Sequence, residues 1–532
     1  MTRNEENARV STLYELLTSS AGLFGANTAI MQKTGEDYVS FSYEKLVSDA
    51  CRIGSALRKL GLRGKHIAIC GKNSYAWVAA YFAVTAYCGV AVPLSKDASA
   101  EEISDAVKHC DVSAVICSDE LADTVGDLVK IKFSELDGLE SGDSEEYAPS
   151  EDDTAELAYT SGTDGRHKAA VLTHKNLCFS VTEMRNIFSV DTSDRLYSVL
   201  PLAHIYERVA GMLAPLYSGA SVAYGEGIRH LTTNMRQVKP TVMLCVPLIL
   251  DKIHTKIWQN IEKKGLVDKV RKVIKLSDAT GPLRMTVRRQ IFADIHGTLG
   301  GKLAVLITGG SAANPETIMG LREFGIRSLQ GYGLTECAAL ISSNRYYEHE
   351  YASVGLPAEG GLTDIYNIGS DGIGEIRYKG DNVMTGYYKD PELTEKVIRG
   401  GWLYTGDMGY FDKNGYLHIV GRKSNMIVTA KRKQVYPEEL EAELIKNPFV
   451  GDVTVTGVNN SEGDFDIVAN IYPDPDGFAE LYGDGYTKDD VKKALENAIK
   501  GVNARVASHK QIKALRILSA PPARNEDGKK IR

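Results

Sequence analysis

Residues 159–168 read Tyr159-Thr-Ser-Gly-Thr-Asp-Gly-Arg-His-Lys168 and directly follow an apolar pair, Leu157-Ala158. Glycines let backbone N–H groups approach a ligand closely, hydroxyl side chains donate hydrogen bonds, and Lys168 supplies a compact positive charge. The stretch therefore predicts a loop that holds a polyphosphate. It differs from the common nucleoside-triphosphate loop, because Lys168 is followed by Ala169 and the glycine spacing is different. Asp164 places a carboxylate inside this predicted anion site.

The composition limits the class of protein. A chain of 532 residues is expected to form two or more domains, and 43% apolar with 25% charged residues is typical of a globular protein. A net charge of −7 argues against a nucleic-acid partner. The eight cysteines form no metal-binding cluster and mostly lie in apolar runs, which predicts buried, reduced thiols. Because the N-terminus lacks a signal-peptide core and no apolar run of about 18 residues occurs, we expect a cytoplasmic protein.

The first part of the chain alternates short apolar runs with amphipathic segments. This rhythm predicts parallel sheets covered by helices. Thr173 is expected to cap a helix that begins near His174. The strands are expected over 66–70, 89–93, 112–117, 241–246 and 305–308, and the helices over 74–87 and 100–109.

After about residue 420 the pattern of predicted strands and helices changes. Pro437 is suited to the first turn of an acidic helix. Strands are expected over 425–429, 452–457, 464–471 and 511–518, with a helix over 488–503. We therefore expect a large domain over 1–420 and a small α+β domain over 421–532. The lysine-rich segment 252–275 could touch a membrane surface, but a solvated helix face is the favoured interpretation.

A second glycine-containing motif, Gly331-Tyr-Gly-Leu-Thr-Glu336, follows the apolar run 326–329. Its glycines suit a tight turn at the end of a strand, where ligands collect in open α/β sheets. Tyr332 offers a flat face to a nucleobase, Thr335 can donate to a phosphate, and Glu336 is a hard oxygen ligand suited to Mg²⁺. An ordinary strand-to-helix turn with a capping threonine is the alternative interpretation.

Three weaker signals follow towards the C-terminus. Asp407, in Tyr404-Thr-Gly-Asp407, could accept hydrogen bonds from both hydroxyls of a ribose, or it could cap a turn. Arg422 could reach a phosphate or ribose, and Gly421 beside it could let the backbone swivel, although a flexible linker would look the same. Residues 521–532 resemble a basic tail.

The order of these segments resembles the adenylate-forming superfamily, which includes acyl-CoA synthetases, luciferases and peptide-synthetase adenylation domains. Pro201-Leu-Ala-His-Ile-Tyr-Glu-Arg208 is more specifically similar to the long-chain fatty acyl-CoA synthetase branch, as is the lysine-rich segment that leads to Gly309-Gly310. The resemblance implies an α/β fold with a large N-terminal domain of parallel-rich sheets and a small, mobile α+β C-terminal domain. It covers nearly the whole chain, with motifs at 159–174, 331–336, 404–407, 421–441 and 524–532.

The activity that the resemblance implies is a two-step ligation. A carboxylate attacks the α-phosphate of ATP-Mg, pyrophosphate leaves, and a thiol captures the acyl-adenylate. The implied phosphate-binding residues are Thr160, Ser161, Gly162, Thr163, Gly165 and Lys168. The implied adenine- and ribose-binding residues are Gly310, Ser311, Ala312, Gly331, Tyr332, Asp407 and Arg422.

The resemblance also implies the catalytic and metal-binding residues. Thr335 would contact the α-phosphate, and His204 would lie near the carboxylate end of the acyl pocket. Lys529 stands at the position of the adenylation lysine, where a cation can draw together two anions that otherwise repel. Glu336 with Thr160 would hold Mg²⁺. Because Lys529 belongs to the small domain, that domain would close and reopen about a hinge at Gly421.

Several positions depart from the family pattern. The family has Thr at Asp164, Pro at His167, Gly at Ala169, Asp or Lys at Gly421, and two glycines where Lys431 and Arg432 stand. Lys530 could also replace Lys529 as the adenylation lysine.

From these features we expect an acyl-CoA synthetase that uses ATP and Mg²⁺ to activate a carboxylic acid, more specifically a fatty acid, and transfers it to CoA. Two alternatives remain open. The acceptor could be the thiol of a carrier protein, or Asp164 could mark a non-catalytic nucleotide-binding relative. Membrane contact would be peripheral at most. The sequence carries no local signature of acyl chain length or of oligomeric state.

Overall fold

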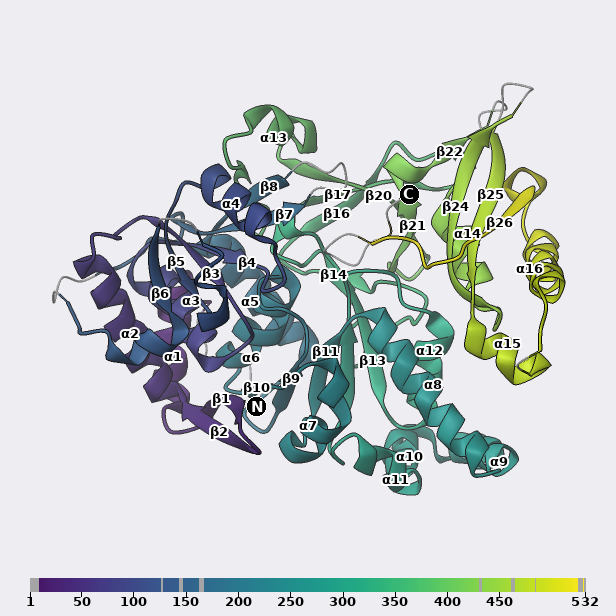
Figure 1. The fold of residues 1–532 in the computed structure, drawn as a ribbon, viewed down its shortest axis with the longest axis horizontal. Coiled ribbons are helices and arrows are strands. Elements are labelled where there is room, and N and C mark those ends of the chain that lie inside the picture. Colours follow the sequence, from purple (N-terminus) through teal and green to yellow (C-terminus); the bar gives the residue numbers. More distant parts are fainter. Residues whose placement is uncertain are drawn as a thin grey trace. The chain divides into compact units, whose positions relative to one another are not determined.

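The computed structural model describes residues 9–125, 128–142, 147–161, 167–429, 433–460, 465–483, 485–524 and 530 (Figure 1). These residues form two compact units. The first holds the chain up to Thr363 together with Tyr378–Leu403, and the second holds Asp364–Arg377 and the chain from Tyr404 onward. Mixed α/β structure with parallel-rich sheets is present, as the sequence predicted. The predicted domain boundary at 420/421 falls inside a strand and stays a prediction.

A seven-stranded sheet in the first unit contains the two strands that flank the predicted phosphate-binding loop. Its neighbouring strands β7, β4, β3, β5 and β6 run parallel, whereas β8 and β18 are antiparallel additions at one edge. The strands lie in the order β18 (Gly386–Tyr387), β8 (His167–Thr173), β7 (Thr154–Ser161), β4 (Val90–Leu94), β3 (His66–Cys70), β5 (Val112–Cys117) and β6 (Val129–Lys132). The strands predicted over 66–70 and 112–117 are confirmed, and the one predicted over 89–93 begins one residue later.

A nine-stranded sheet makes the rest of the first unit's core. Its central strands, from β13 to β1, all run parallel. The strands lie in the order β15 (Leu356–Pro357), β14 (Ser342–Ser343), β13 (Arg327–Tyr332), β12 (Val305–Thr308), β11 (Val242–Cys245), β9 (Arg195–Ser198), β10 (Ser221–Tyr224), β1 (Thr28–Thr34) and β2 (Asp37–Ser42). The predicted strand over 305–308 is confirmed, and the strand predicted over 241–246 is one residue shorter at each end.

Helices cover these sheets. Because α3 is apolar on every side, 12 of its 13 residues are buried, and it packs between its sheet and α2. α8 and α12 lie against β12 and β13 (Figure 1). The helices are α1 (Leu13–Phe24), α2 (Tyr43–Lys59), α3 (Tyr75–Tyr87), α4 (Ala100–His109), α5 (His174–Phe188), α6 (Ala214–Tyr217), α7 (Leu231–Val238), α8 (Pro247–Lys263), α9 (Val267–Ser277), α10 (Arg284–Ile291), α11 (Ala293–Thr298), α12 (Pro315–Glu323) and α13 (Pro391–Val397).

Helix starts follow the local capping chemistry. The predicted cap is confirmed, since the Thr173 hydroxyl accepts from the Asn176 N–H at the start of α5. The helix predicted over 100–109 is confirmed to the residue and begins with a reciprocal capping box between Ser99 and Glu102. Among the described helices, none combines the length and apolar character needed to cross a bilayer.

The second unit contains a three-stranded sheet of β24 (Val450–Asn459), β25 (Phe465–Pro473) and β26 (Ala514–Ile517). β25 is antiparallel to β24 and parallel to β26. Its helices are α14 (Pro437–Leu444), α15 (Pro475–Tyr482) and α16 (Lys488–Asn503), and the last confirms the predicted bounds. The strand predicted over 425–429 is present but shorter, as β22 (Ile427–Val428), which pairs with β23 (Gln434–Val435). Asn425 belongs instead to the 3₁₀ turn Lys423–Asn425.

A further sheet contains β16 (Leu362–Tyr366), β17 (Gly374–Lys379), β20 (Trp402–Phe411), β19 (Ile398–Arg399) and β21 (Leu417–Arg422). β20 and β21 are antiparallel neighbours, joined through the segment 412–416. This pairing places Asp407 opposite Arg422 and Met408 opposite Gly421.

Candidate active site

Two parallel neighbours of the nine-stranded sheet end beside each other. Thr308 of β12 pairs with Gln330 of β13, so the residues that follow both strands emerge at the same edge. Gly310, Ser311 and Ala312 are exposed there, and Gly310 has a φ of 83°, which favours glycine. The structure therefore brings the predicted adenine-binding residues Gly310–Ala312 to the strand end that carries Gly331 and Tyr332. Their role in binding stays a prediction.

The turn after β13 is wound tightly. A Cβ on Gly333 would lie 2.2 Å from the carbonyl oxygen of Ala339, so only glycine fits at this position. Ala338 and Ala339 both have positive φ angles, of 45° and 69°, which side chains other than glycine seldom adopt. Held strain of this kind concentrates at functional sites. Thr335 begins only a 3₁₀ turn, Thr335–Cys337, whose N-cap is Leu334, so the turn differs from the alternative of an ordinary helix capped by threonine.

Glu336, on this turn, is bound by two side chains from distant parts of the chain. The Lys168 ammonium donates to Glu336 Oε1 at 2.8 Å, and the Tyr387 hydroxyl donates to the same oxygen at 2.6 Å. Lys168 also donates to the Tyr387 hydroxyl at 2.8 Å. β8 carries Lys168 and its neighbour β18 carries Tyr387, so the sheet places both residues against the turn.

The electrostatics of this triad keep Glu336 ionised. Burial favours the neutral acid, but the charge of Lys168 and the hydrogen bonds from Lys168 and Tyr387 outweigh it and lower the pKa of Glu336 to about 2. The Glu336 side chain is 14% exposed and that of Lys168 is 27% exposed. A partly shielded, permanently ionised carboxylate is the form that a divalent cation needs.

Thr160 lies beside Lys168 on the neighbouring strand β7. It lies directly opposite Lys168 in the β7–β8 pair, and opposite residues of an antiparallel pair point to the same face. A carboxylate and a hydroxyl fit the hard-oxygen preference of Mg²⁺, which also takes phosphate oxygens and water as ligands. Within the described part of the chain, no group of three or more His, Cys, Asp or Glu side chains could hold a metal by itself. A metal bound to Glu336 would therefore need ligands other than a cluster of these side chains among the described residues.

The other predicted phosphate-binding residues cannot be placed in the same way. Gly162, Thr163, Asp164 and Gly165 lie outside the described residues, and only the backbone of Ser161 is described.

His204 follows a loop whose carbonyl groups are held by a buried arginine. Nη1 of Arg208 donates to the carbonyl oxygens of Leu202 and Ala203 at 2.7 and 2.8 Å. The guanidinium also forms a bidentate pair with Glu156 of β7, in which Nε and Nη2 lie 2.8 and 2.7 Å from the two carboxylate oxygens. Both charged side chains are fully buried, and the Tyr81 hydroxyl donates to Glu156 at 2.8 Å. This network fixes the position of the His204 loop.

Arg208 lies on a π-helical segment, Glu207–Leu213, of the kind that is frequent at functional sites. Glu207 is also fully buried, and neither of its carboxyl oxygens makes a hydrogen bond of ordinary geometry with a described residue. Burial raises the pKa of Glu207 to about 8, against a small opposing effect of the nearby Ser198 hydroxyl. Burial therefore favours the neutral form of Glu207 beside the ion pair of Arg208.

The predicted ribose-binding residues meet in the second unit. Arg422 Nε lies 2.8 Å from Asp407 Oδ1, and Asp407 is 5% exposed. Gly421 directly precedes two anchored residues, since Arg422 pairs with Asp407 and Lys423 pairs with Glu375 at 2.7 Å. A Cβ on Gly421 would lie 2.5 Å from Glu438 Oε2, so packing rather than a positive φ favours glycine here. The hinge role of Gly421 stays a prediction.

The C-terminal tail is anchored through Lys530. Its ammonium lies 2.8 Å from Asp452 Oδ1 and donates to the Val453 carbonyl at 2.6 Å. Arg524 binds the other oxygen of Asp452 at 2.6 Å. Lys529, Lys431 and Arg432 lie outside the described residues. The ammonium of Lys530 is thus engaged within its own unit, and the assignment of Lys529 as the adenylation lysine stays a prediction.

Sequence reasoning missed Tyr387 and Glu156. Tyr387 stands in a short polar stretch with no recognisable motif, so no local signal was available. Glu156 is the one charged residue in the otherwise apolar run 155–158, which marks a buried charge and predicts a cationic partner.

Comparison with known proteins agrees with this geometry. The family model described as AMP-binding enzyme matches residues 17–388. The chain belongs to the AMP-binding enzyme family. The matched region contains Lys168, His204, Glu336 and Tyr387, whereas Asp407, Arg422 and Lys529 lie beyond it.

Among curated AMP-binding relatives, long chain acyl-CoA synthetase 6, peroxisomal, of Arabidopsis thaliana is 30% identical over 83% of this chain and 69% of that protein. Long-chain-fatty-acid--CoA ligase 5 of Rattus norvegicus is 29% identical over 87% of this chain and 76% of that protein. O-succinylbenzoate coenzyme A synthetase from Bacillus subtilis, solved with ATP and magnesium ion, has a TM-score of 0.75 at 22% identity and covers 97% of this chain and 98% of its own. That likeness concerns the fold.

Proposed function

We propose that this AMP-binding enzyme activates a fatty acid with ATP to form an acyl-adenylate and transfers the acyl group to CoA. The contact between Lys168 and Glu336 carries the proposal. It joins the strand that follows the glycine- and hydroxyl-rich loop to the Gly331–Glu336 turn, so the cation proposed to bind phosphate and the carboxylate proposed to bind Mg²⁺ lie 2.8 Å apart. The named relatives support the choice of a fatty acid and of CoA.

The phosphate and metal roles follow from this contact. Lys168 would release Glu336 Oε1 to Mg²⁺ and turn its ammonium to the β- and γ-phosphates. Thr160 would supply a hydroxyl ligand from the same face, with Ser161, Gly162, Thr163 and Gly165 completing the phosphate loop. Mg²⁺, when bound, would neutralise phosphate charge. The low pKa of Glu336 keeps its carboxylate available over the physiological pH range.

The residues proposed to bind adenine and those proposed to bind ribose lie in different parts of the chain. Gly310–Ala312 and the ring of Tyr332 would line the adenine, with Gly331 allowing the close approach. Asp407 would accept from the ribose hydroxyls, held in place by Arg422. In the first step, an oxygen of the acid attacks the α-phosphorus, the bond to the bridging oxygen breaks, and pyrophosphate leaves. Thr335 and Lys529 would stabilise the charge that develops on the α-phosphate.

The second step is attack of the CoA thiolate on the acyl carbon, which breaks the mixed anhydride and releases AMP. His204 would lie at the carboxylate end of the acyl site, held there by the contacts of Arg208 with Leu202 and Ala203. A domain over 421–532 would carry Lys529 into the first step and swing away about Gly421 for the second. We also propose a cytoplasmic location, which the eight free cysteines support.

The test is carboxylate-dependent exchange of radiolabelled pyrophosphate into ATP, screened over acids from acetate to palmitate with and without Mg²⁺. We expect Mg²⁺-dependent exchange that is fastest with a fatty acid, and CoA thioester in a second assay. Absence of ATP-Mg binding by calorimetry at millimolar concentration contradicts the function.

A separate assay addresses the acceptor. Pre-formed acyl-adenylate is offered to CoA and to an acylatable carrier protein. We expect faster transfer to CoA. Transfer to the carrier protein alone would assign the acceptor to that thiol instead.

A further inference from the structure

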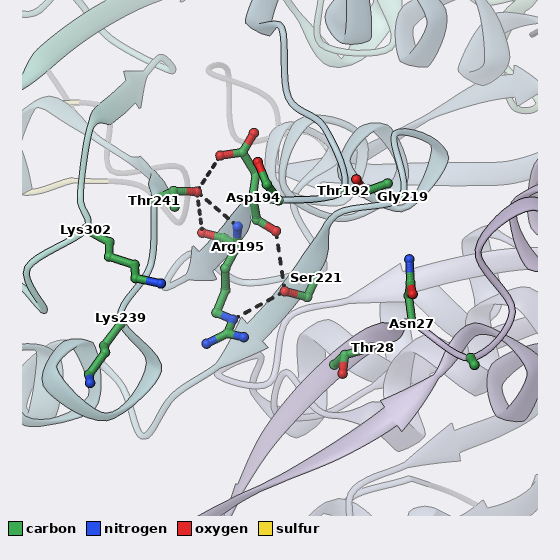
Figure 2. Close-up of a pocket in the computed structure, with 12 residues that line it drawn as sticks. Asn27, Thr28, Thr192, Asp194, Arg195, Gly219, Ser221, Lys239, Thr241 and Lys302 are labelled. Carbon is green, nitrogen blue, oxygen red and sulfur yellow. Dashed lines mark hydrogen bonds between the residues drawn. The ribbon is translucent and has the colours of Figure 1, made fainter. Parts of the chain in front are cut away.

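A second polar site lies at the amino ends of the parallel strands of the nine-stranded sheet. Gly310 and Tyr332 lie at the opposite, carboxyl ends of these strands. A pocket of about 490 Å³ opens at the amino ends of the parallel strands β9, β10, β11 and β12 (Figure 2). Arg195 and Ser221 begin β9 and β10, Thr241 precedes β11, and Lys302 lies in the turn before β12. Because parallel strands keep their carboxyl ends together, this pocket is separate from the candidate active site.

Arg195 places an uncompensated charge in this pocket. Its side chain is half-buried, and Nη1 and Nε donate to the Val238 carbonyl at 2.6 Å and to the Ser221 hydroxyl at 3.4 Å. Burial lowers the pKa of the Arg195 guanidinium. Both groups it contacts are neutral, so the contacts place the guanidinium but leave its charge unbalanced.

A carboxylate that lines the same pocket, that of Asp194, is turned away from Arg195. Its two oxygens accept from the Thr241 hydroxyl at 2.6 Å and from the Asp191 N–H at 3.0 Å. Figure 2 shows the Asp194 carboxylate on the side of Thr241, whereas the Arg195 guanidinium points the other way, between Ser221 and the lysines. Asp194 therefore does not balance the charge of Arg195.

Two exposed lysines, Lys239 and Lys302, line the same pocket. Over the residues that the structure describes, neither lysine nor Arg195 forms an ion pair with a carboxylate. In a chain with a net charge of −7, three unbalanced cations around one cavity create a local positive potential. The remaining lining is mostly hydroxyl and amide groups, which suits an oxygen-rich ligand and not an acyl chain.

We propose that this pocket binds a phosphate monoester through Arg195, Lys239 and Lys302. The planar guanidinium matches two phosphate oxygens, and the lysines balance the second charge of the dianion. A cavity of this size accommodates a small metabolite. The phosphate could belong to a free ester or to the headgroup of a phospholipid, and the same side chains would bind it in both cases.

The primary test is titration calorimetry with glycerol 3-phosphate. We expect saturable binding by the wild type, weakened about tenfold or more in Lys239→Glu/Lys302→Glu, because two attractive charges become repulsive. Lys269→Glu, on the exposed face of α9, is the matched control and should bind as the wild type does. Arg195→Gln should lose binding while keeping its melting temperature. Should that variant not fold, the exposed double-lysine variant still decides the result.

The phosphate source is tested by co-sedimentation with phosphatidylcholine vesicles that contain or lack phosphatidic acid. Retention by phosphatidic acid vesicles without binding of glycerol 3-phosphate assigns the phosphate to a lipid headgroup, provided that the double-lysine variant abolishes retention. Binding of neither probe overturns the proposal. So does equal binding by the wild type and the double-lysine variant, or an equal loss in Lys269→Glu, which would show a non-specific charge effect.

Discussion

The guanidinium of Arg208 binds both carboxylate oxygens of Glu156, at 2.7 and 2.8 Å, with neither side chain exposed to solvent. Glu156 belongs to a strand of the seven-stranded sheet, whereas Arg208 belongs to the π-helical segment that follows His204. The same guanidinium binds two carbonyls of the His204 loop. One buried ion pair thereby connects the sheet that carries Thr160 to the loop that carries His204.

Removal of one partner of this pair should destabilise the protein strongly. Arg208→Ala leaves the Glu156 carboxylate buried without a cation, and we expect the free energy of unfolding to fall by about 3–5 kcal/mol. Urea denaturation followed by circular dichroism measures the change. Arg236→Ala, at an exposed position of α7, is the control and should change stability by less than about 0.5 kcal/mol.

A double replacement separates stability from positioning. Glu156→Leu/Arg208→Met exchanges the ion pair for apolar side chains and should recover most of the stability. It cannot restore the donors to the Leu202 and Ala203 carbonyls, so kcat/KM should stay low. Full recovery of kcat/KM would show that Arg208 has no role in positioning the His204 loop.

The Lys168–Glu336 pair predicts a specific pH dependence. The pKa of Glu336 is lowered from 4.5 to about 2 in the folded protein. Its ionised form therefore stabilises the fold above about pH 4.5, and this contribution disappears as the pH falls towards 2. In Lys168→Met, burial is no longer outweighed and the pKa of Glu336 should rise. The acid limb of the pH–rate profile and the midpoint of acid unfolding should both move to higher pH.

Two further variants test the size and the specificity of this change in the pKa of Glu336. Tyr387→Phe removes the 2.6 Å hydrogen bond but keeps the ion pair, so the shift should have the same direction and be smaller. Lys175→Met removes a partly exposed lysine, 3.5 Å from Asp381, and should leave the pH profile unchanged. A profile for Lys168→Met that overlays the wild type would contradict the assigned charge coupling.

Replacement of the two tail lysines, Lys529 and Lys530, should have different effects on the two steps of the reaction. Lys529→Ala should abolish adenylation but spare thioester formation from supplied acyl-adenylate, because its charge is needed only where two anions meet. Lys530→Ala should lower the melting temperature by releasing Asp452, with a smaller loss of adenylation. Pyrophosphate exchange and thioester release measure the two steps. Normal exchange in Lys529→Ala with loss in Lys530→Ala would assign the catalytic role to Lys530.

Asp164 should weaken phosphate binding. A carboxylate about 4 Å from one phosphate charge costs on the order of 4 kcal/mol at an effective dielectric constant of about 20. Asp164→Thr should therefore tighten ATP binding or speed adenylation, as measured by calorimetry and pyrophosphate exchange. An equal or slower rate would show that the carboxylate points away from the phosphates or assists Mg²⁺.

Local sequence predicted most of the secondary structure because the signals are local. The threonine cap, the acidic first turn and the amphipathic spacing place α16 at Lys488–Asn503, and short apolar runs place β3, β5 and β12. The strand predicted over 425–429 is shorter for a local reason as well, since Asn425 belongs to the 3₁₀ turn Lys423–Asn425. The resemblance to adenylate-forming enzymes, which rests on motifs of a few residues each, predicted the family that the comparison confirms.

By itself, the sequence determined the elements and the kinds of side chain available for chemistry. Tertiary structure alone decided which of them meet. Lys168 and Glu336 are 168 positions apart, and Tyr387 is 219 positions from Lys168, so no short-range pattern records their contact. The same holds for Glu156 with Arg208, and for the cations that gather at the amino ends of four strands. Strand order and register set the distances between these side chains. Where the side chains are also buried, their charges shift each other's pKa values or require an oppositely charged partner.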